Sequence, residues 1–286
     1  MLKQRVLTAA VALPLAIALM VYGSIYVVAA FLAVAVALCT YEVASMLQPK
    51  LEAAFAEASG LDVVETRGGA WTVWWAVLIA VGTFVFVSLD TLGAGVGVAV
   101  FGLLSCFLVG AFFAPDNSLA FGRITTLVIS IIYGSFPWLS IWELYTFGEG
   151  PRFLFMLVAI VWFGDTGAYF GGRRFGRQKL APRMSPNKTK EGALCGLISS
   201  GVGGVLINVI YGGELGGFGL VLGVSLLGGA FGQMGDLVES TLKRFAGVKD
   251  SGFIFPGHGG ILDRVDGVIF AAPVIWFVLY ISSLLA

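Results

Sequence analysis

Residues 92–113 read LGAGVGVAVFGLLSCFLVGAFF, a run without a single charged side chain. A helix of about 20 residues rises about 30 Å, which is the thickness of the hydrocarbon core of a bilayer. Because backbone amides in hydrocarbon need partners within their own segment, the run predicts a membrane-spanning helix. Eight more predominantly apolar runs, some with one or two charged residues, lie at about 6–22, 24–46, 71–89, 124–144, 153–172, 192–212, 217–236 and 264–285. The sequence therefore predicts an all-α fold, a polytopic membrane bundle of about nine helices.

The composition supports this class. Of 286 residues, 58% are hydrophobic and 12% are charged, against about a quarter charged in soluble domains. The net charge of zero gives no basic surplus of the kind that binds nucleic acid. Cys39, Cys106 and Cys195 lie apart inside apolar runs, so we interpret them as packing residues. The start, MLKQRVLTAAVALPLAIALMVYG, resembles a signal peptide, but another apolar run follows at once and predicts a retained helix.

The placement of lysine and arginine predicts the orientation. All but one of the 17 basic residues fall before the first span or after spans two, four, six and eight, the exception being Arg152. Basic loops stay in the cytoplasm. We therefore expect a cytoplasmic amino terminus and an outside carboxyl terminus.

The halves of the sequence differ in polar content. Residues 1–150 predict a scaffold of about five helices, whereas residues 151–286 predict about four helices that carry the polar motifs. Residues 50–70 are expected to form a cytoplasmic loop with a short surface helix. Glu42 is interpreted as a helix-packing residue, the alternative being that it joins the site.

Two polar clusters border the sixth and seventh spans. In WFGDTGAYFGGRRFGRQK, Asp165 lies inside a span, where an acidic group is costly and usually faces a wet cavity; the alternative is a hydrogen bond to a neighbouring helix. In RMSPNKTKEG (183–192), Ser185 and Thr189 are candidate helix caps. Lys188, with Arg183 and Lys190, is a candidate phosphate contact or an ordinary topology signal.

Two more clusters border the last two spans. In GQMGDLVESTLKR (232–244), helical spacing places Asp236, Glu239 and Ser240 on one face. In the glycine-rich segment, KDSGFIFPGHGGILDRVDG (249–267), Asp263 and Asp266 begin the last span. The glycines of this segment suit close approach of a phosphate chain. His258 stands alone, so zinc is not expected.

The three aspartates Asp236, Asp263 and Asp266 are expected to converge at the membrane face. Clustered carboxylates repel each other unless a cation neutralises them. Oxygen ligands beside lysine and arginine favour Mg²⁺, which shares its coordination with phosphates. Such a site suits phosphoryl chemistry between a soluble nucleotide and a lipid phosphate.

Residues 240–266 resemble the signature of the phosphatidate cytidylyltransferase (CDP-diacylglycerol synthase) family. The upstream motifs GDTGAYFGG, SPNKTKEG and GDLVES are similar to secondary motifs of that family, although Asn187 stands where many members carry lysine. The amino-terminal half matches only in hydropathy. The matching signature positions are Ser240, Leu242, Lys243, Arg244, Lys249, Asp250, Gly252, Pro256, His258, Gly259, Gly260, Asp263, Arg264 and Asp266.

The resemblance implies that CTP and phosphatidic acid react to give CDP-diacylglycerol and pyrophosphate, with residues 151–286 as the catalytic region. It implies Mg²⁺ at a two-cation site whose second ion, divalent or K⁺, stays open, and a homodimer in a cell membrane. The implied metal ligands are Asp236, Asp263 and Asp266. The candidate catalytic residues are Asp236, Ser240, Lys243, Arg244, Lys249, Asp250, His258 and Arg264, and the candidate substrate contacts are Asp165, Ser185, Lys188, Thr189, Gly259 and Gly260.

Three alternatives stay open at the sequence level. One is a related cytidylyltransferase acting on another lipid phosphate, and one is a CTP-dependent kinase acting on a lipid alcohol. The third is an ion-coupled transporter, in which Asp165, Asp236 and Asp266 would line a path. The sequence holds no internal repeat of the kind common in transporters, and most of its acidic motif residues lie at one membrane face, so the enzyme is favoured.

Overall fold

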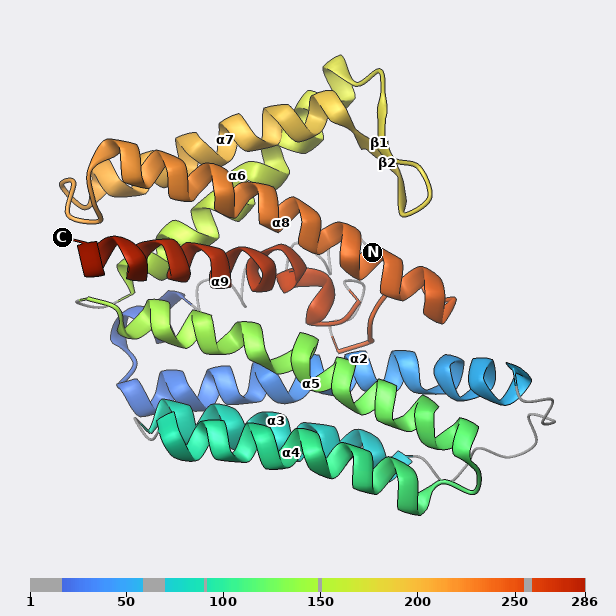
Figure 1. Cartoon of the computed structure of the whole chain (residues 1–286). Coiled ribbons are helices and arrows are strands. Elements are labelled where there is room, and N and C mark those ends of the chain that lie inside the picture. The colour runs from blue at the N-terminus through green and yellow to red at the C-terminus, as the bar shows by residue number, and fades with distance from the viewer. Residues whose placement is uncertain (1–16, 59–69, 90–91, 149–150, 255–258, 286) are drawn as a thin grey trace. The chain divides into compact units, whose positions relative to one another are not determined.

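The computed structural model describes residues 17–58, 70–89, 92–148, 151–254 and 259–285. Within these ranges, eight helices are long and apolar enough to cross a membrane. They match eight of the predicted spans, while the predicted span 6–22 lies mostly outside the described residues; residues 17–22 are helical. The helices are α2 (Ile25–Ala58), α3 (Ala70–Ser88), α4 (Leu92–Phe113), α5 (Asn117–Thr146), α6 (Arg152–Phe175), α7 (Lys190–Ile210), α8 (Phe218–Ala246) and α9 (Leu262–Leu285) (Figure 1).

Helix α2 corrects one expectation. It runs through Pro49 to Ala58, so residues 50–58 continue the spanning helix and do not form the predicted loop with a separate surface helix. Residues 51–58 are rich in alanine, leucine and glutamate, which are strong helix formers. The run of apolar residues ends where the helix leaves the bilayer, but the helix itself can continue into water. Hydropathy alone therefore places the end of α2 too early.

The chain divides into two compact units. Unit 1 comprises residues 1–139 and 242–263, and unit 2 comprises residues 140–241 and 264–286. Residues 242–263 thus group with the amino-terminal half, although they carry most of the signature pattern. The assignment of a scaffold role to residues 1–150 and a catalytic role to residues 151–286 stays a prediction.

In unit 1, α2, α3 and α4 lie side by side (Figure 1). An apolar core formed by α3, α4 and α5 includes Ile79, Cys106 and Ile131, which are buried together. A buried ion pair joins polar helix ends: Arg123 of α5 donates to Glu52 of α2 over 3.1 Å, and also to the carbonyl oxygen of Phe113. These contacts bring the carboxyl ends of α2 and α4 to the amino end of α5, as the predicted alternation of spans requires.

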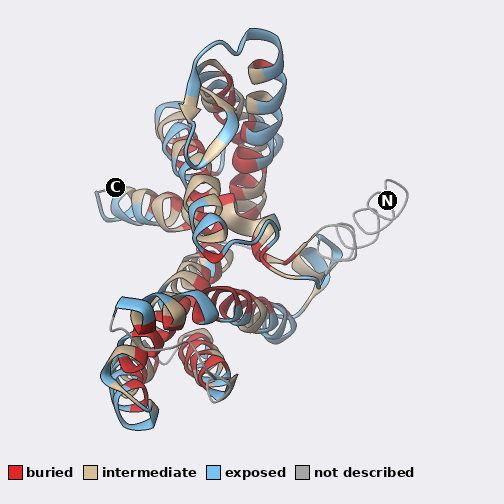
Figure 2. Ribbon diagram, turned by 90° about the vertical axis from the view of Figure 1, so that its right-hand side faces the viewer, coloured by how far each residue is buried: buried red, intermediate tan, exposed pale blue. Residues whose placement is uncertain are grey.

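In unit 2, α6 and α7 pack closely through small residues. A Cβ at Gly203 would lie 2.8 Å from the carbonyl oxygen of Ala159, and one at Gly164 would lie 2.5 Å from the Ser200 hydroxyl. Small residues let helix backbones approach in a membrane, where van der Waals packing contributes much of the association. Buried residues lie on the helix faces turned toward other helices (Figure 2).

A short β-hairpin precedes α7 and is the one addition to the expected all-α fold within the described residues. Strands β1 (Lys179–Ala181) and β2 (Ser185–Thr189) are antiparallel. Thr189 caps α7, since its hydroxyl accepts from the Gly192 amide over 3.2 Å. Ser185 lies in β2, so the expectation that it also caps a helix is wrong.

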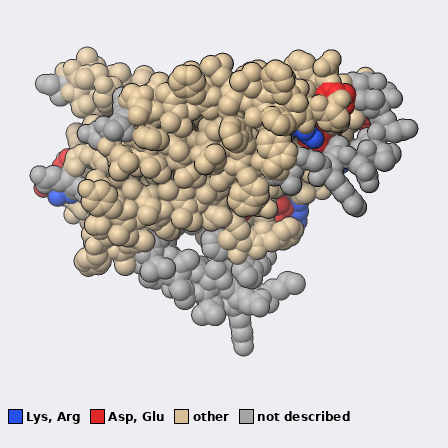
Figure 3. Space-filling view, turned by 90° about the horizontal axis from the view of Figure 1, so that it is seen from below, with Lys and Arg blue, Asp and Glu red and all other residues tan. Residues whose placement is uncertain are grey.

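The surface agrees with a membrane environment. On the face drawn in Figure 3, the broad middle carries almost no lysine, arginine, aspartate or glutamate, and the charged side chains in view lie toward its ends. Large apolar side chains such as Phe101, Phe112 and Val209 are exposed. Hydrocarbon accepts such a surface, whereas water penalises an apolar area of this extent.

Candidate active site

Unit 2 contains a cavity of about 520 Å³ in which four predicted site residues meet. It lies between α6, the hairpin and the polar part of α8. The predicted site residues in its wall are Asp165, Lys188, Thr189 and Asp236, and they are joined by Asn187, Gln233 and glycines of α6 and α7. The four come from three separate sequence motifs, which the structure therefore brings to one place.

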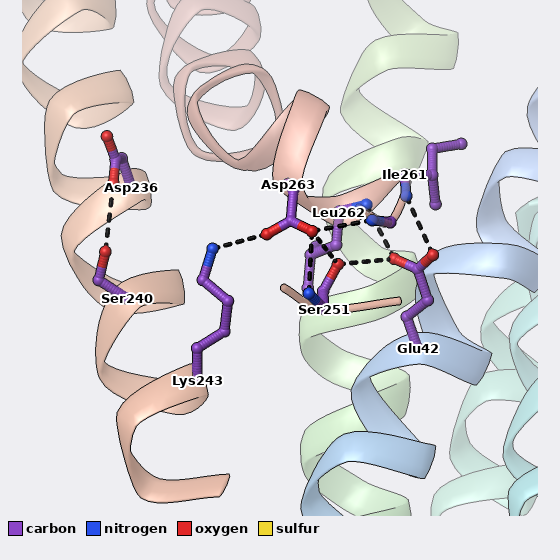
Figure 4. Close-up of polar contacts among 9 residues, drawn as sticks. Glu42, Asp236, Ser240, Lys243, Ser251, Ile261, Leu262 and Asp263 are labelled. Carbon is purple, nitrogen blue, oxygen red and sulfur yellow. Dashed lines mark hydrogen bonds and ion pairs between the residues drawn. The ribbon is translucent and has the colours of Figure 1, made fainter. Parts of the chain in front are cut away.

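An ion pair crosses this cavity wall. The Lys188 ammonium lies 2.6 Å from Asp236 Oδ2, and the side chains are 27% and 39% exposed. One turn further along α8, the Ser240 hydroxyl donates to Asp236 Oδ1 over 3.3 Å (Figure 4). The predicted shared face of Asp236 and Ser240 is therefore present, while Glu239 is buried.

Asp165 lies ten residues before the end of α6 at Phe175, which corresponds to about 15 Å along the helix. This is deeper than the sequence-based span implied, because α6 continues three residues past the predicted end at 172. The carboxylate is nevertheless exposed in the cavity. Its place in the cavity wall agrees with the first of its two interpretations, a residue that faces a cavity.

Helices α8 and α9 approach closely where two of the predicted metal ligands lie. A Cβ at Gly235 would overlap the backbone oxygen of Asp266, and one at Gly232 would lie 3.4 Å from the Gly267 oxygen. Asp236 follows Gly235 directly, so the helix positions of Asp236 and Asp266 are brought to the same level of unit 2. Asp266 is half-buried.

Asp263, in the first turn of α9, is the centre of a polar cluster in unit 1 (Figure 4). Its Oδ1 accepts from the Lys243 ammonium over 2.6 Å, and the two side chains are 8% and 16% exposed. Its Oδ2 accepts from the Ser251 amide and the Gly260 amide over 2.8 Å each, and lies 3.0 Å from the Ser251 hydroxyl. The Gly260 amide, expected to be open to phosphate, is taken by Asp263 in this arrangement.

Glu42 of α2 reaches the same part of unit 1. Its side chain is buried, and its oxygens accept from the backbone amides of Ile261 and Leu262 over 3.0 Å each. The Ser251 hydroxyl lies 3.0 Å from Glu42 Oε2 (Figure 4). Glu42 thus contacts residues more than 200 positions later in the chain. Glu42 therefore lies where α2 meets the start of α9 and binds polar groups there, and its membership of the site stays a prediction.

The other predicted residues are more scattered. Lys249 and Asp250 are exposed and line a second cavity, of about 780 Å³, together with Glu42 and Tyr41 of α2. Arg244 and Arg264 are exposed, and Ser185 is outside the wall of the unit 2 cavity. Gly259 has φ +83°, where a side chain is strained. His258 lies outside the described residues.

Carboxylate oxygens are donors that Mg²⁺ accepts, and the predicted ligands differ in how available theirs are. Asp236 offers carboxylate oxygens in an accessible cavity, whereas Asp263 has one oxygen occupied by protein donors and the other facing Lys243. Among the described residues, no group of three or more histidine, cysteine, aspartate and glutamate side chains is arranged as a metal site. Asp236 and Asp266 belong to unit 2 and Asp263 to unit 1, so convergence of the three stays a prediction.

Sequence reasoning missed the role of Glu42 and of Ser251. The usable signal was that Glu42 is an acidic residue inside an otherwise apolar span, the same signal that singled out Asp165. Nothing local to Glu42 identifies its partners. Ser251 lies inside the glycine-rich segment 249–267, but no sequence pattern there predicts its contacts.

Comparison with known proteins finds several that are similar in sequence to this chain. A Staphylococcus saprophyticus protein named phosphatidate cytidylyltransferase is 39% identical over 172 residues, which cover 60% of this chain and 65% of that protein. Proteins of the same name from Staphylococcus aureus and Brucella suis are 42% identical over 160 residues and 40% identical over 162 residues. These two matches cover 56% and 57% of this chain and 60% and 55% of those proteins. The chain thus spans less than two thirds of these curated relatives.

The match to a family profile is more extensive than any of these pairwise alignments. The profile described as "Cytidylyltransferase family" matches residues 3–282. It therefore includes α2 and Glu42, the cavity of unit 2 and the cluster around Asp263. Together with the eight spanning helices, this match shows that the chain is a multi-span membrane protein belonging to the cytidylyltransferase family.

Proposed function

We propose that this protein transfers the cytidylyl group of CTP to phosphatidic acid, giving CDP-diacylglycerol and pyrophosphate. The observation that carries the proposal is the cavity of unit 2, where Asp165, Lys188 and Asp236 gather at the polar ends of spanning helices. Such a cavity suits a charged triphosphate that meets a lipid headgroup at the membrane surface. The names of the relatives at about 40% identity support the choice of substrates.

The reaction needs little proton transfer. The phosphate monoester of phosphatidic acid has a second pKa of about 6 and is largely deprotonated at neutral pH. One of its oxygens attacks the α-phosphorus of CTP, and the bond from that phosphorus to the bridging oxygen breaks as pyrophosphate leaves. The protein must therefore hold two anions together and stabilise charge on the leaving group.

The residues of the cavity suit these tasks. Lys188 carries an ammonium at the cavity wall that can turn from Asp236 toward a phosphate. Lys249 and Arg264, both exposed, supply further positive charge for the substrates. Ser240 donates to Asp236 and keeps that carboxylate oriented.

In this proposal Asp236, Asp263 and Asp266 would hold Mg²⁺ through carboxylate oxygens, of which Asp263 Oδ1 pairs with Lys243 in this structure. When bound, Mg²⁺ neutralises phosphate charge and stabilises the departing pyrophosphate. The convergence of the three aspartates, the second cation and the homodimer belong to this proposal. So do a cytoplasmic amino terminus, an outside carboxyl terminus and a site facing the cytoplasm of a cell membrane.

A radiolabelled assay tests the proposal. Purified protein in mixed micelles receives CTP, Mg²⁺ and one of several lipid phosphates, and the lipid product and pyrophosphate are both measured. We expect CDP-diacylglycerol with phosphatidic acid, and loss of turnover by at least about 100-fold in Asp236→Asn, because that substitution removes a ligand charge. Removal of Mg²⁺ with a chelator should likewise abolish the product.

The matched control is Glu57→Gln, an acid-to-amide change on the exposed end of α2, which should leave turnover unchanged. A phosphorylated lipid and CDP as products would instead identify a lipid kinase. Preference for another lipid phosphate would identify a related cytidylyltransferase. Full activity of Asp236→Asn would remove that residue from the site.

A further inference from the structure

We propose that Glu42 is a positioning residue of this reaction: its buried carboxylate, on a helix of the amino-terminal half, holds Ser251 and the start of α9 in place. The inference rests on the proposed function. The effect of Glu42 would pass through Ser251 and Asp263 to Lys243, and through the neighbouring Lys249 and Asp250.

The first step concerns the start of α9. A helix begins with backbone amides that have no partner within the helix, and a nearby side chain usually satisfies them. Here Glu42, from α2, accepts from the amides of Ile261 and Leu262 at 3.0 Å each. A carboxylate at a helix amino terminus is also favoured by the helix dipole. Glu42 therefore satisfies two backbone amides at the start of α9.

The second step concerns Ser251. Its hydroxyl lies 3.0 Å from Glu42 Oε2 and 3.0 Å from Asp263 Oδ2, while its amide donates to Asp263. One hydroxyl has one proton and can donate to only one of the two carboxylates at a time. The bridge links Glu42 to Asp263, whose other oxygen holds the Lys243 ammonium. Loss of Glu42 would therefore loosen Asp263, a predicted metal ligand, and its partner Lys243, a predicted catalytic residue.

The third step concerns two glycines of the signature pattern. A Cβ at Gly252 would lie 2.5 Å from Glu42 Oε1, and a Cβ at Gly260 would overlap the same carboxylate. Neither glycine is recorded with positive φ, in contrast to Gly259. Their small size is thus required because Glu42 occupies the space beside them.

The fourth step concerns the cost of Glu42. A carboxylate in a spanning helix is unfavourable unless donors surround it. Glu42 is 2% exposed and has three donors within 3.0 Å. It also borders the cavity that Lys249 and Asp250 line. A displacement of Ser251 would move these two residues, which directly precede it in the chain.

Three measurements on Glu42→Gln test the proposal. The amide keeps the size of the side chain but turns one acceptor into a donor that faces backbone N–H groups. We expect kcat for CDP-diacylglycerol formation to fall about 10- to 100-fold, with KM for CTP within about twofold. Hydrogen exchange in residues 259–263 should rise about tenfold. Glu42→Asp keeps the charge and should retain more of kcat than Glu42→Gln.

The matched control is Glu52→Gln. Glu52 lies on the same helix and is as deeply buried, but it pairs with Arg123. The Glu52→Gln substitution should lower thermal stability and leave kcat per folded molecule unchanged. Glu42→Gln with wild-type kcat, or with a kcat loss that only follows the folded fraction, would overturn the proposal.

A second variant pair keeps the test independent of folding. Gly252→Ala alone should lower kcat, because its Cβ displaces Glu42. In a Glu42→Ala background the same substitution should cause little further loss of kcat, because the space beside residue 252 is empty. Additive losses would contradict the proposed contact. If the wild type forms no CDP-diacylglycerol, the proposed function fails, and exchange in residues 259–263 then decides whether Glu42 holds this part of the chain.

Discussion

At the scale of single residues, two lysine–aspartate pairs of equal length differ in their surroundings. Lys188–Asp236 and Lys243–Asp263 are both 2.6 Å apart. In the first pair the lysine and aspartate side chains are 27% and 39% exposed, whereas in the second pair they are 16% and 8% exposed. An exposed pair contributes about 0–1 kcal/mol to stability. Breaking a buried pair costs more, because it leaves one charge without compensation.

This contrast predicts different losses of stability for two matched variants. Lys188→Met should lower the free energy of unfolding by less than about 1 kcal/mol but reduce turnover strongly, since the ammonium lies in the cavity. Lys243→Met should lower that free energy by up to about 3–5 kcal/mol. Methionine keeps much of the apolar stem in both variants. Denaturant titration of the protein in micelles, alongside the CTP assay, measures both quantities, and equal stability losses would contradict the comparison.

At the scale of elements, the α6–α7 pair shows why glycine is frequent in this chain. Gly203 lies where α7 meets the Ala159 carbonyl and Phe163 of α6, whose atoms would be 2.8 and 3.0 Å from an added Cβ. Gly223 of α8 has no heavy atom within 4 Å of that position. Both glycines lie in the interior of spanning helices. They differ only in what packs against them.

Substitution by alanine should separate the two positions. Gly203→Ala should destabilise unit 2 by about 1–3 kcal/mol, because the helices must move apart. Gly223→Ala should be neutral or stabilising by up to about 1 kcal/mol, since alanine favours helix over glycine. Thermal unfolding in one detergent compares them. A loss at Gly223 equal to that at Gly203 would show that packing between α6 and α7 is not the cause.

At the scale of the whole molecule, the basic loops predict which ends of the helices face the cytoplasm. Glu57 lies near the end of α2, on the predicted cytoplasmic side, and Glu214 lies between α7 and α8 on the predicted outer side. Glu214 pairs with Arg152, the one basic residue expected outside. The two positions therefore report on opposite faces of the membrane.

Labelling of single cysteines tests this topology. In a variant whose native cysteines Cys39, Cys106 and Cys195 are replaced by alanine, Glu214→Cys should react with an impermeant maleimide in intact cells. Glu57→Cys should react only after the membrane is permeabilised. The reverse pattern would invert the orientation and place the cavity of unit 2 outside, where CTP is not expected.

The spanning helices were predictable from local sequence because each satisfies its own backbone hydrogen bonds. Eight predicted spans correspond to α2–α9, and the largest errors are at polar helix ends, such as residues 50–58 of α2. The motif residues Asp165, Lys188 and Asp236 were also recognisable, because charged groups are rare in apolar runs. Their arrangement in one cavity required the structure.

The number of spans, the expected orientation and the chemical character of the motifs follow from residue order alone, since hydropathy and charge act over a single helix or loop. The hydrogen-bond partners of Glu42 do not follow from residue order. Ser251 and Leu262 lie 209 and 220 positions away, and no local pattern specifies which buried acid meets which helix start. That pairing depends on how α2 packs beside the start of α9 within unit 1. Tertiary packing alone can bring the donors of one segment to the acceptor of another.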